Sequence, residues 1–399
     1  MSHPPQSLYP QTVDQFKQVV TAFQASHYYA PPVLFAVGRR VMTKNHVLAS
    51  VRYPVVNGPG QNTGTAAILM KVLGVEPTGV QNVTLSGTEL NKILLYFAPF
   101  QNDGKKHSNI EALQAACTAS LGNTPNDKTF VATFIFDDVE PQGVEDSTLK
   151  LYGLSNRLFK PNQLNLARIF TKLPNVAWIG DTPLDSDEIE QSLMSAAFSG
   201  ALYAPHMIDK FPLYTHRINA VKMGVRITDQ HKVRLGAYLG EGTTLMPGAS
   251  YVNFNAGTDG AMIEGRISSS AFVGKGSDIG GGASILGTLS GGNSIPISVG
   301  RNCLLEVNCA LGIPVGDAVI IGAETAVMSS SRVRVGIEGH TLQGQTVKAL
   351  ELANINAVTF RRNDADGALE VVRTRRNEEF ARKLEDGESI LSADLHKNG

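Results

Sequence analysis

The chain contains 399 residues, of which 42% are hydrophobic and 18% are charged, and its formal net charge is −1. This length is enough for two or three domains with substantial cores, and the near-zero charge gives no indication of nucleic-acid or membrane-surface binding. Three cysteines are too few for a disulfide framework or a cysteine-based zinc site. The N-terminus lacks a signal-peptide pattern and no apolar run approaches the length of a membrane span, so we expect a soluble cytoplasmic protein without a membrane partner.

Residues 1–215 are predicted to form an N-terminal α/β domain. Apolar, β-branched runs predict strands at Val33–Val41, Phe130–Phe136 and Val176–Ile179. Helices are expected after capping-box patterns that begin at Ser86, Ser108 and Asp185. The Gly-rich segment Gly58–Thr65 lacks the Gly-Lys-Ser/Thr ending of a phosphate-binding loop, so we interpret it as a turn. Nothing in this domain indicates catalysis, and we expect it to serve packing, assembly or substrate shaping.

A six-residue repeat dominates residues 216–340. Apolar residues recur at positions 227, 233, 239, 245 and 251, and again at 267, 273, 279, 285, 297, 303, 309, 315, 321, 327 and 333. This period fits neither a helix nor an alternating strand, but it is typical of hexapeptide β-helix repeats, in which three hexads close one triangular coil. We therefore predict a left-handed parallel β-helix, an exception to the right-handed crossover rule, with the marked side chains stacked inside. Cys303 and Cys309 fall on the repeat and are interpreted as buried small hydrophobic residues.

Three departures from the repeat are candidate sites, because loops on a rigid scaffold often carry function. One is the end of the prism, after about Val333, and the other two interrupt the repeat. Between Tyr251 and Ile267 the frame slips, and we expect a loop to leave the coil. Between Ile285 and Ile297 one hexad is replaced while the frame is kept. The first interruption carries Glu264, which is either a solvated surface charge or a catalytic carboxylate.

Histidine, a frequent base in hexapeptide-repeat acyltransferases, is scarce in the repeat region. His216 and His231 lie near its start and His340 at its end, which also argues against a cluster of histidine metal ligands. If the domain is an acyltransferase, its proton acceptor is expected to be a carboxylate, and Glu264 is the best-placed candidate.

Several longer segments occur together and in order. They are VRLGAYLGEGTTLMPGASYVNFNAGT, MIEGRISSSAFVGKGSDIGGGASILGTLSGG and CLLEVNCALGIPVGD, with DKFP, KALEL, FRRN and LSADLH outside them. In these segments the chain resembles the tetrahydrodipicolinate N-succinyltransferases of the longer, trimeric type, within the hexapeptide-repeat acyltransferase superfamily. The resemblance covers residues 205–399 strongly and the preceding residues more loosely.

The resemblance implies a CoA-dependent N-acyltransferase of the diaminopimelate and lysine pathway. Succinyl-CoA would be the co-substrate, and the acceptor would be the amine of ring-opened tetrahydrodipicolinate (2-amino-6-oxopimelate), a small molecule with two carboxylates. Glu264 matches the catalytic glutamate, and Gly287 matches a glycine whose backbone N–H faces the thioester oxygen. The implied acyl-CoA contacts are Arg266, Gly281, Ser284, Val307, Gly322, Ala323, Ser330, Lys348, Arg361, Arg362, Asn363 and Asp364. The family also implies a homotrimer with Glu264 near a subunit boundary.

The chemistry leaves two routes open. An ammonium group is not a nucleophile, so Glu264 can take its proton directly, or it can attack first and form a succinyl anhydride. The family's acidic positions for a magnesium ion correspond here to His231 and residues 247–249, so we predict no metal.

Residues 341–399 are predicted to form a C-terminal CoA-binding hairpin and tail. The hairpin turns at Asp366-Gly367 and a short helix follows it. The motif match favours phosphate binding by Arg361 and Arg362, whereas residues 373–376 are interpreted as a solvated basic stretch. No aromatic residues interleave with this charge, so nucleic acid is not expected as a partner. Two alternatives stay open: an acetyl-CoA-dependent N-acetyltransferase acting on the same or a related amine, and a noncatalytic β-helix scaffold.

Overall fold

The computed structural model describes residues 8–101, 103–121, 129–200, 205–289 and 294–396. Its contacts divide the chain into two compact units. The N-terminal unit comprises Met1–Gly153 and Leu164–Pro212, and the coil unit comprises Leu154–Gln163 and Leu213–Gly399. The expected domain boundaries at 215 and 340 stay a prediction. Among the described helices, none is long and apolar enough to span a membrane.

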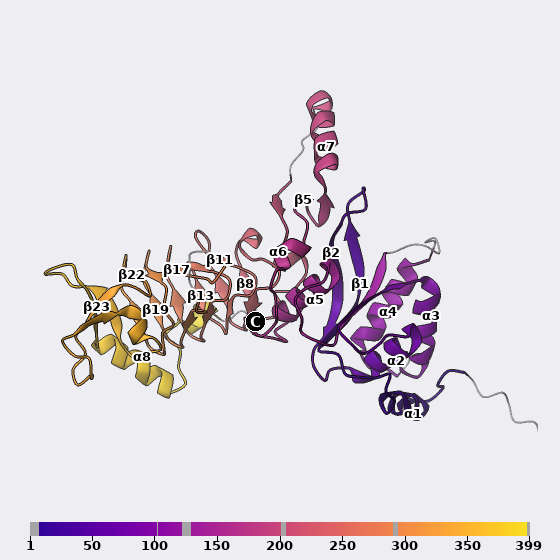
Figure 1. Ribbon diagram of the computed structural model, residues 1–399, viewed down its shortest axis with the longest axis horizontal. Coiled ribbons are helices and arrows are strands. Elements are labelled where there is room, and N and C mark those ends of the chain that lie inside the picture. The colour runs from indigo at the N-terminus through magenta and orange to yellow at the C-terminus, as the bar shows by residue number, and fades with distance from the viewer. Residues whose placement is uncertain (1–7, 102, 122–128, 201–204, 290–293, 397–399) are drawn as a thin grey trace, which may run out of the picture. The chain divides into compact units, whose positions relative to one another are not determined.

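A four-stranded antiparallel sheet with the order β2-β1-β4-β3 forms the centre of the N-terminal unit. Its strands are β1 (Leu34–Met42), β2 (Leu48–Asn57), β3 (Val80–Leu85) and β4 (Phe130–Ile135). Helices α2 (Thr63–Leu73), α3 (Gly87–Tyr96) and α4 (Ser108–Ala119) lie together on one side of it (Figure 1). Their apolar faces bury a core that includes Phe35, Ile68, Leu90, Leu113 and Phe134, with α1 (Val13–Gln24) packed against it.

This unit contains one further sheet and several further helices. A second, antiparallel sheet has the order β6-β5-β7 and packs around Trp178. The bounds are η1 (Ala98–Phe100), α5 (Val144–Ser155), α6 (Ile169–Lys172), β5 (Val176–Ile179), β6 (Thr182–Leu184), α7 (Ser186–Ser199) and β7 (Met207–Asp209).

The three predicted strands of this unit are confirmed as β1, β4 and β5, with ends that differ by at most one residue. Two capping boxes are also confirmed: Ser86 starts α3 and Asp185 starts α7, each exchanging hydrogen bonds with the glutamate three residues later. The third is wrong. Ser108 is the first residue of α4, and His107 precedes it without a side-chain cap.

The coil unit is built from two-residue strands that visit three parallel sheets in turn. The first face holds β9 (Tyr238–Leu239), β12 (Gly257–Thr258), β15 (Phe272–Val273) and β18 (Ser298–Val299). The second holds β8 (Arg226–Ile227), β10 (Thr244–Leu245), β13 (Met262–Ile263), β16 (Asp278–Ile279), β19 (Leu304–Leu305) and β21 (Ile320–Ile321). The third holds β11 (Tyr251–Val252), β14 (Arg266–Ile267), β17 (Ser284–Ile285), β20 (Ala310–Leu311) and β22 (Ala326–Val327). Before β9 lie η2 (Tyr214–His216) and η3 (Gln230–Lys232).

The hexad period sets the spacing of these faces at the start of the coil. Ile227 pairs with Leu245 and Leu245 with Ile263, each 18 positions later, so three hexads complete one coil. The second residue of a strand points inward, where Leu245 and Ile263 are fully buried, while the first points outward. The stacked inward side chains form the aliphatic core that the repeat predicted.

The first interruption shifts the frame as predicted, but no loop leaves the coil there. Strands β12 and β13 continue the faces between Tyr251 and Ile267. Only Glu264 and Gly265 separate β13 from β14, and this short corner moves the later residues out of the earlier frame. The sequence concealed β12 because its inward residue is the polar Thr258, which is fully buried.

The second interruption does not keep the frame, so that prediction is wrong. Val273 pairs with Val299, 26 positions later and eight more than three hexads, which moves the frame by two. The inward aliphatic residues are therefore Val299, Leu305 and Leu311. Positions 297, 303 and 309, two residues earlier in each hexad, are also apolar and buried. The apolar pattern of the sequence therefore continues through them although the strand register has changed. Residues 290–293 of this segment lie outside the described residues.

The C-terminal segment completes the second face. There β21 pairs in parallel with β25 (Thr359–Arg362), which forms the predicted hairpin with β26 (Leu369–Val372). Two further strands, β23 (Arg332–Val335) and β24 (Thr346–Lys348), end the sheet, and η4 (Ala349–Leu352) follows them. Helix α8 (Arg375–Glu385; Figure 1) confirms the predicted short helix. Its Phe380 packs with Ile320 and Leu304 of the second face. A last turn of helix, α9, spans Ala393–His396.

Candidate active site

Glu264 occupies the tightest corner of the coil, between the second and third faces. Its neighbour Gly265 is required there, because a methyl group on that residue would lie 2.3 Å from the carbonyl oxygen of Ala283 in the next coil. The Glu264 backbone N–H donates to the Ile279 carbonyl at 2.8 Å. A methyl group on Gly281 would lie 3.7 Å from Glu264 Oε2, so the carboxylate runs along the corner toward the next coil.

The same corner of later coils carries several of the predicted CoA contacts. The Asn308 N–H donates to the Gly281 carbonyl at 2.9 Å, and the Glu324 N–H donates to the Val307 carbonyl at 2.9 Å. The Gly322 N–H donates to the Phe360 carbonyl of β25 at 2.8 Å, so β25 continues the same corner by one more strand. Neighbouring strands lie about 4.8 Å apart, so Glu264, Gly281, Val307, Ala323 and Arg361 follow one another up the corner, one strand spacing at a time.

A cavity of about 620 Å³ opens on the third face, beside this corner. Arg266 and Ser284 line it as ladder partners, and the guanidinium donates to Ser284 Oγ at 2.7 and 3.0 Å. Gly287 lines the far corner, where a methyl group would lie 2.4 Å from the Ser269 carbonyl oxygen. Within the part of the chain that the structure describes, the buried Ser269 hydroxyl has no hydrogen-bond partner. The other lining residues are Tyr251, Asn253, Ser268, Leu286, Leu289, Ala310 and Met328.

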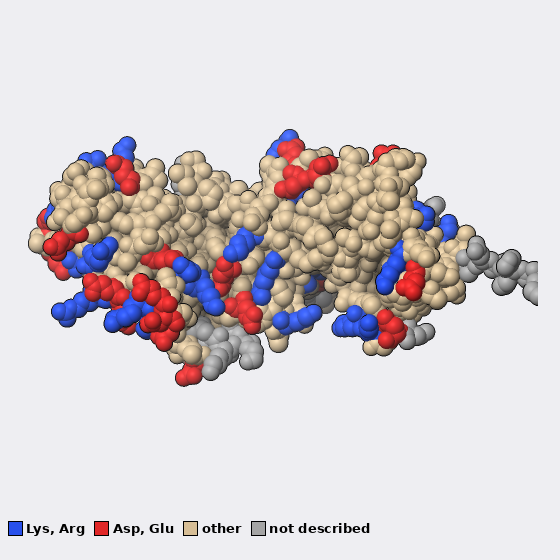
Figure 2. All heavy atoms as spheres, turned by 90° about the horizontal axis from the view of Figure 1, so that it is seen from below, with Lys and Arg blue, Asp and Glu red and all other residues tan. Residues whose placement is uncertain are grey.

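The buried Glu370 contacts two residues of the predicted arginine segment, Arg361 and Asn363. Arg361 Nε lies 3.0 Å from Glu370 Oε1, and Asn363 Nδ2 donates to Glu370 Oε2 at 2.9 Å. The Arg361 side chain also lies against Gly322, since a methyl group there would be 3.4 Å from Arg361 Cβ. Arg362 donates to the Gly367 carbonyl at 3.2 Å. On the face shown in Figure 2, basic and acidic side chains are interleaved over the C-terminal part of the coil unit.

Ser330 and Lys348 lie away from the Glu264 corner. Ser330 is on the corner that also carries Gly287, two coils further along. The Ala349 N–H donates to the Ser331 carbonyl at 2.8 Å, which brings Lys348 next to this corner. Asp364 is at the exposed turn of the β25–β26 hairpin. The predicted residues therefore surround the third face along both of its corners and its C-terminal end.

Asp278 is a functional candidate that the sequence did not reveal. It is the outward residue of β16 and the ladder partner of Met262, two positions before Glu264. Its Oδ1 atom is buried and lacks a hydrogen-bond partner among the described residues. Burial raises the pKa of Asp278 to about 6; the charge of Glu264 adds to this rise and Arg376 opposes it. An aspartate at an outward strand position looks ordinary in sequence, and only the packing around it marks it.

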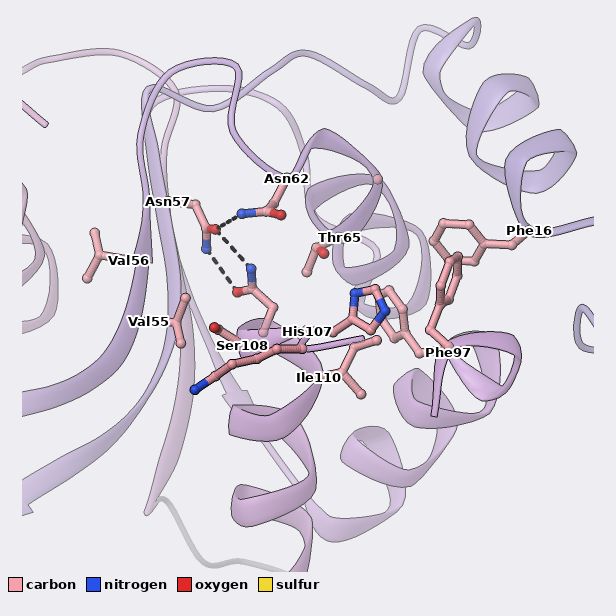
Figure 3. A pocket seen from close by; sticks show the side chains of 14 residues that line it. Phe16, Val55, Val56, Asn57, Asn62, Thr65, Phe97, His107, Ser108 and Ile110 are labelled. Carbon is pink, nitrogen blue, oxygen red and sulfur yellow. Dashed lines mark hydrogen bonds between the residues drawn. The ribbon is translucent and has the colours of Figure 1, made fainter. Parts of the chain in front are cut away.

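A second cavity, of about 450 Å³, lies within the N-terminal unit (Figure 3). Asn57 on its wall exchanges two hydrogen bonds of 3.0 Å with Asn109 and accepts one of 2.7 Å from Asn62. Phe16 and Phe97 form an aromatic wall opposite these amides. None of the predicted site residues lines this cavity.

The other candidate groups do not add a site. Cys303 and Cys309 are confirmed as buried, and burial raises the pKa of each thiol to about 12, which keeps them protonated and inert. Within the described ranges, no three His, Cys, Asp or Glu side chains come together as a possible metal site.

Comparison with known proteins connects both units to one family. A family model described as the tetrahydrodipicolinate N-succinyltransferase N-terminal region matches residues 14–171, and one for the middle region of the same family matches residues 173–212. These matches lie in the part of the chain where the motifs were least informative.

Full-length relatives extend the match over the coil unit. The 2,3,4,5-tetrahydropyridine-2,6-dicarboxylate N-succinyltransferase of Sulfurimonas denitrificans is 38% identical over 407 aligned residues, covering 97% of this chain and 99% of the relative. The enzyme of the same name from Pseudomonas paraeruginosa is 46% identical over 262 residues, covering 65% of this chain and 74% of the relative. A Campylobacter jejuni crystal structure, described as a 2,3,4,5-tetrahydropyridine-2-carboxylate N-succinyltransferase, superposes with a TM-score of 0.85 at 34% identity, covering 93% of this chain and 99% of that one.

Proposed function

Because the chain belongs to the tetrahydrodipicolinate N-succinyltransferase family, we propose that it transfers the succinyl group of succinyl-CoA to the amine of ring-opened tetrahydrodipicolinate. The acceptor, 2-amino-6-oxopimelate, is a small dicarboxylate of the diaminopimelate and lysine pathway. The observation that carries this proposal is the 38% identity with a named N-succinyltransferase along 97% of the chain. The Glu264 corner and the adjoining cavity supply residues suited to the reaction.

Glu264 is the proposed catalytic carboxylate. In the direct route, its carboxylate takes one proton from the substrate ammonium, and the free amine attacks the thioester carbonyl carbon. A C–N bond forms, the C–S bond breaks, and the second amine proton leaves with the CoA thiolate. In the anhydride route, Glu264 attacks the thioester carbonyl carbon first, the C–S bond breaks, and the CoA thiolate leaves and takes one proton of the substrate ammonium. The amine then attacks the succinyl carbonyl of the anhydride, the C–O bond to Glu264 breaks, and the freed carboxylate takes the second amine proton and releases it to solvent. Both routes use the same corner geometry.

The third-face cavity is the proposed acyl site. The Gly287 backbone N–H would donate to the thioester oxygen as negative charge develops on it. Arg266 would pair with the terminal carboxylate of the succinyl group, because a guanidinium forks onto a carboxylate with two N–H donors. The Ser269 hydroxyl supplies a further donor on the cavity wall.

The CoA moiety would follow the corner from Gly281 toward β25. Small residues at Gly281, Gly322 and Ala323 would let the pantetheine arm approach the backbone, and exposed Val307 would contact it. Arg361, Arg362, Asn363, Asp364, Lys348 and Ser330 would hold the nucleotide end, with the arginines on phosphate. Arg361 is already oriented for this by Glu370, 3.0 Å from its Nε.

The proposed architecture is a left-handed parallel β-helix over residues 216–340, assembled as a cytoplasmic homotrimer. Three flat faces allow three such prisms to pack side by side, and the site is open on the third face where a neighbour would close it. We propose no resident metal. Sedimentation at micromolar concentration measures the stoichiometry, and a monomer with full activity would contradict a site shared between subunits.

The nearest alternative is acetyl transfer to the same or a related amine. Arg266 on the wall of the acyl cavity favours succinyl, because an acetyl group has no carboxylate to pair with a guanidinium. A noncatalytic scaffold is the other alternative, and it predicts neither CoA binding nor sensitivity to substitution of Glu264.

The test is CoA thiol release by the purified protein with tetrahydrodipicolinate, comparing succinyl-CoA with acetyl-CoA and wild type with Glu264→Gln. We expect a strong preference for succinyl-CoA and a loss of kcat of about 10²–10⁴-fold in the variant, because its amide cannot take a proton or attack. Glu324→Gln, on the same corner three coils further, is the matched control for folding. Preference for acetyl-CoA would move the function to the first alternative, and absence of turnover with both donors would contradict the proposal.

A further inference from the structure

Asp278 and Glu264 project from neighbouring strands on the same outer side of the coil. Met262 and Glu264 flank the inward Ile263, so both point outward, and Met262 is the ladder partner of Asp278. Diagonal neighbours on adjacent strands are about 7–8 Å apart at the backbone, a gap that a glutamate side chain can largely cross. The two carboxyl groups therefore share one patch at the edge of the second face.

On the side away from Glu264, Asp278 has an apolar ladder partner and helix α8 as neighbours. Its other ladder partner, Leu304, packs with Ile320 and with Phe380 of α8. Two charged groups act on Asp278: Glu264 from the end of β13 and Arg376 from α8. Arg376 is itself held 3.1 Å from Glu306, so it only partly compensates the buried carboxyl. The unpartnered Oδ1 atom marks a site that a proton can fill.

We infer that Asp278 is the proton-holding partner of Glu264 in the acyl transfer, an inference that rests on the proposed function. When the substrate ammonium enters, one of its protons passes to the Glu264–Asp278 pair. The amine attacks the acyl carbon as the C–S bond breaks, and its second proton leaves with the CoA thiolate. The pair then releases its proton to solvent, so one ammonium and one thioester yield one amide, one thiol and one proton.

This pairing gives each carboxyl a separate task. Two carboxylates in close proximity do not ionise independently, and the more buried one holds a proton more readily. A pKa near 6 for Asp278 lies close to neutrality, where uptake and release of a proton are both easy. Asp278 acts through Glu264 and is a positioning residue, because Glu264 is the group that faces the reacting atoms.

The same environment makes the stability of the protein depend on pH through Asp278. Its pKa is raised from 3.8 to about 6 in the folded chain, mainly by burial. Its contribution to stability is therefore fully present below pH 3.8 and is lost as the pH rises through about 6. Asp278→Asn, which cannot ionise, should unfold at a higher temperature than wild type at pH 8 and lose that advantage at pH values well below 6.

The decisive experiment is the pH profile of succinyl transfer by wild type, Asp278→Asn and Asp317→Asn. Asp317 is the matched control, because its carboxylate is on the coil but pairs with Arg301 at 2.6 Å, away from the site. We expect kcat of Asp278→Asn to fall about 10- to 100-fold with little change in KM for succinyl-CoA, and the limb near pH 6 to disappear. A profile that superimposes on wild type, or a loss that leaves the limb in place, would overturn the inference.

A second measurement separates this inference from the proposed function. In a ¹³C-carboxyl NMR titration of the intact protein, the midpoint of Asp278 should fall in Glu264→Gln, because the neighbouring charge is removed. An unchanged midpoint would show that the carboxyls are not paired and would overturn the inference even in an active enzyme. If the wild-type protein transfers no acyl group, the proposed function is wrong. A shifted Asp278 midpoint in that case would still show that the two carboxyl groups interact, but their role in acyl transfer would be wrong as well.

Discussion

The cavity of the N-terminal unit and the cavity on the third face of the coil differ in how their polar groups are satisfied. In the first, Asn57, Asn62 and Asn109 hydrogen-bond to one another, so the wall is complete without a ligand. On the wall of the second, Ser269 Oγ is buried without a partner among the described residues, and so is Asp278 Oδ1 on the adjoining second face. Buried polar groups are normally paired, because leaving one unpaired costs about 1–3 kcal/mol. The difference teaches that a cavity lined by polar side chains need not be reactive; buried polar groups without a partner are the better guide to chemistry.

Gly287→Ala, in the third-face cavity, should lower activity more than the Arg361→Ala and Asn57→Ala substitutions. A methyl group there would lie 2.4 Å from the Ser269 carbonyl oxygen, so the backbone must shift and its N–H must move from the acyl group. Loss of such a donor lowers kcat by about 10²–10³-fold. Steady-state kinetics on protein that retains its oligomeric state measures this, and Gly339→Ala, at an open turn with positive φ, controls for the general effect of replacing glycine. Normal kcat in Gly287→Ala would exclude its backbone from oxyanion binding.

A smaller effect is expected from Arg361→Ala, which removes a proposed phosphate contact. KM for succinyl-CoA should rise about 10-fold while kcat changes less, because phosphate binding is uniform between ground and transition states. The substitution also leaves Glu370 buried without its ion-pair partner, so unfolding should be measured in parallel. Arg334→Ala, whose guanidinium pairs with the exposed Asp366, is the control for loss of an arginine. An unchanged KM would remove Arg361 from the CoA site.

The smallest effect on activity is expected in the N-terminal cavity. Asn57→Ala would leave Asn62 and Asn109 without their common partner and should lower the free energy of unfolding by about 2 kcal/mol. Its kcat and KM should stay at wild-type values at a temperature where the variant is folded. Urea denaturation with kinetics below the transition checks both quantities. A variant with normal stability and impaired turnover would break the distinction between the two cavities.

The hexad period predicted the three-sided coil because one side chain in six must point inward. It could not locate the frame through the second interruption, since Cys303 and Cys309 are small residues buried two positions before Leu305 and Leu311. Both positions satisfy an apolar pattern, and only the strand register separates them. The same limit applies to Thr258, a polar residue that continues the core.

The candidate site could be proposed from the sequence where a residue type alone suits the chemistry. Glu264 stood out because histidine is scarce in the repeat, and Arg266 with Ser284 followed from the family motif. Asp278 could not be found in this way, because the rise in its pKa comes from burial and from the charge of Glu264, and both depend on the fold. In the N-terminal unit, Ser108 satisfied a capping pattern but became the first helical residue, because local pattern does not fix where the chain enters a helix.

The end of the second face has a consequence for solubility. A stack of parallel rungs exposes an unpaired strand edge, and a copy of the same molecule could continue it into a fibre. Here β25 pairs in parallel with β21, β26 reverses direction after it, and the sheet ends at β24, a three-residue strand that carries Lys348. A short, charged edge is a poor template for further strands. The C-terminal segment therefore also terminates what would otherwise be a self-propagating surface, and truncation before β25 should convert the protein into an aggregating one.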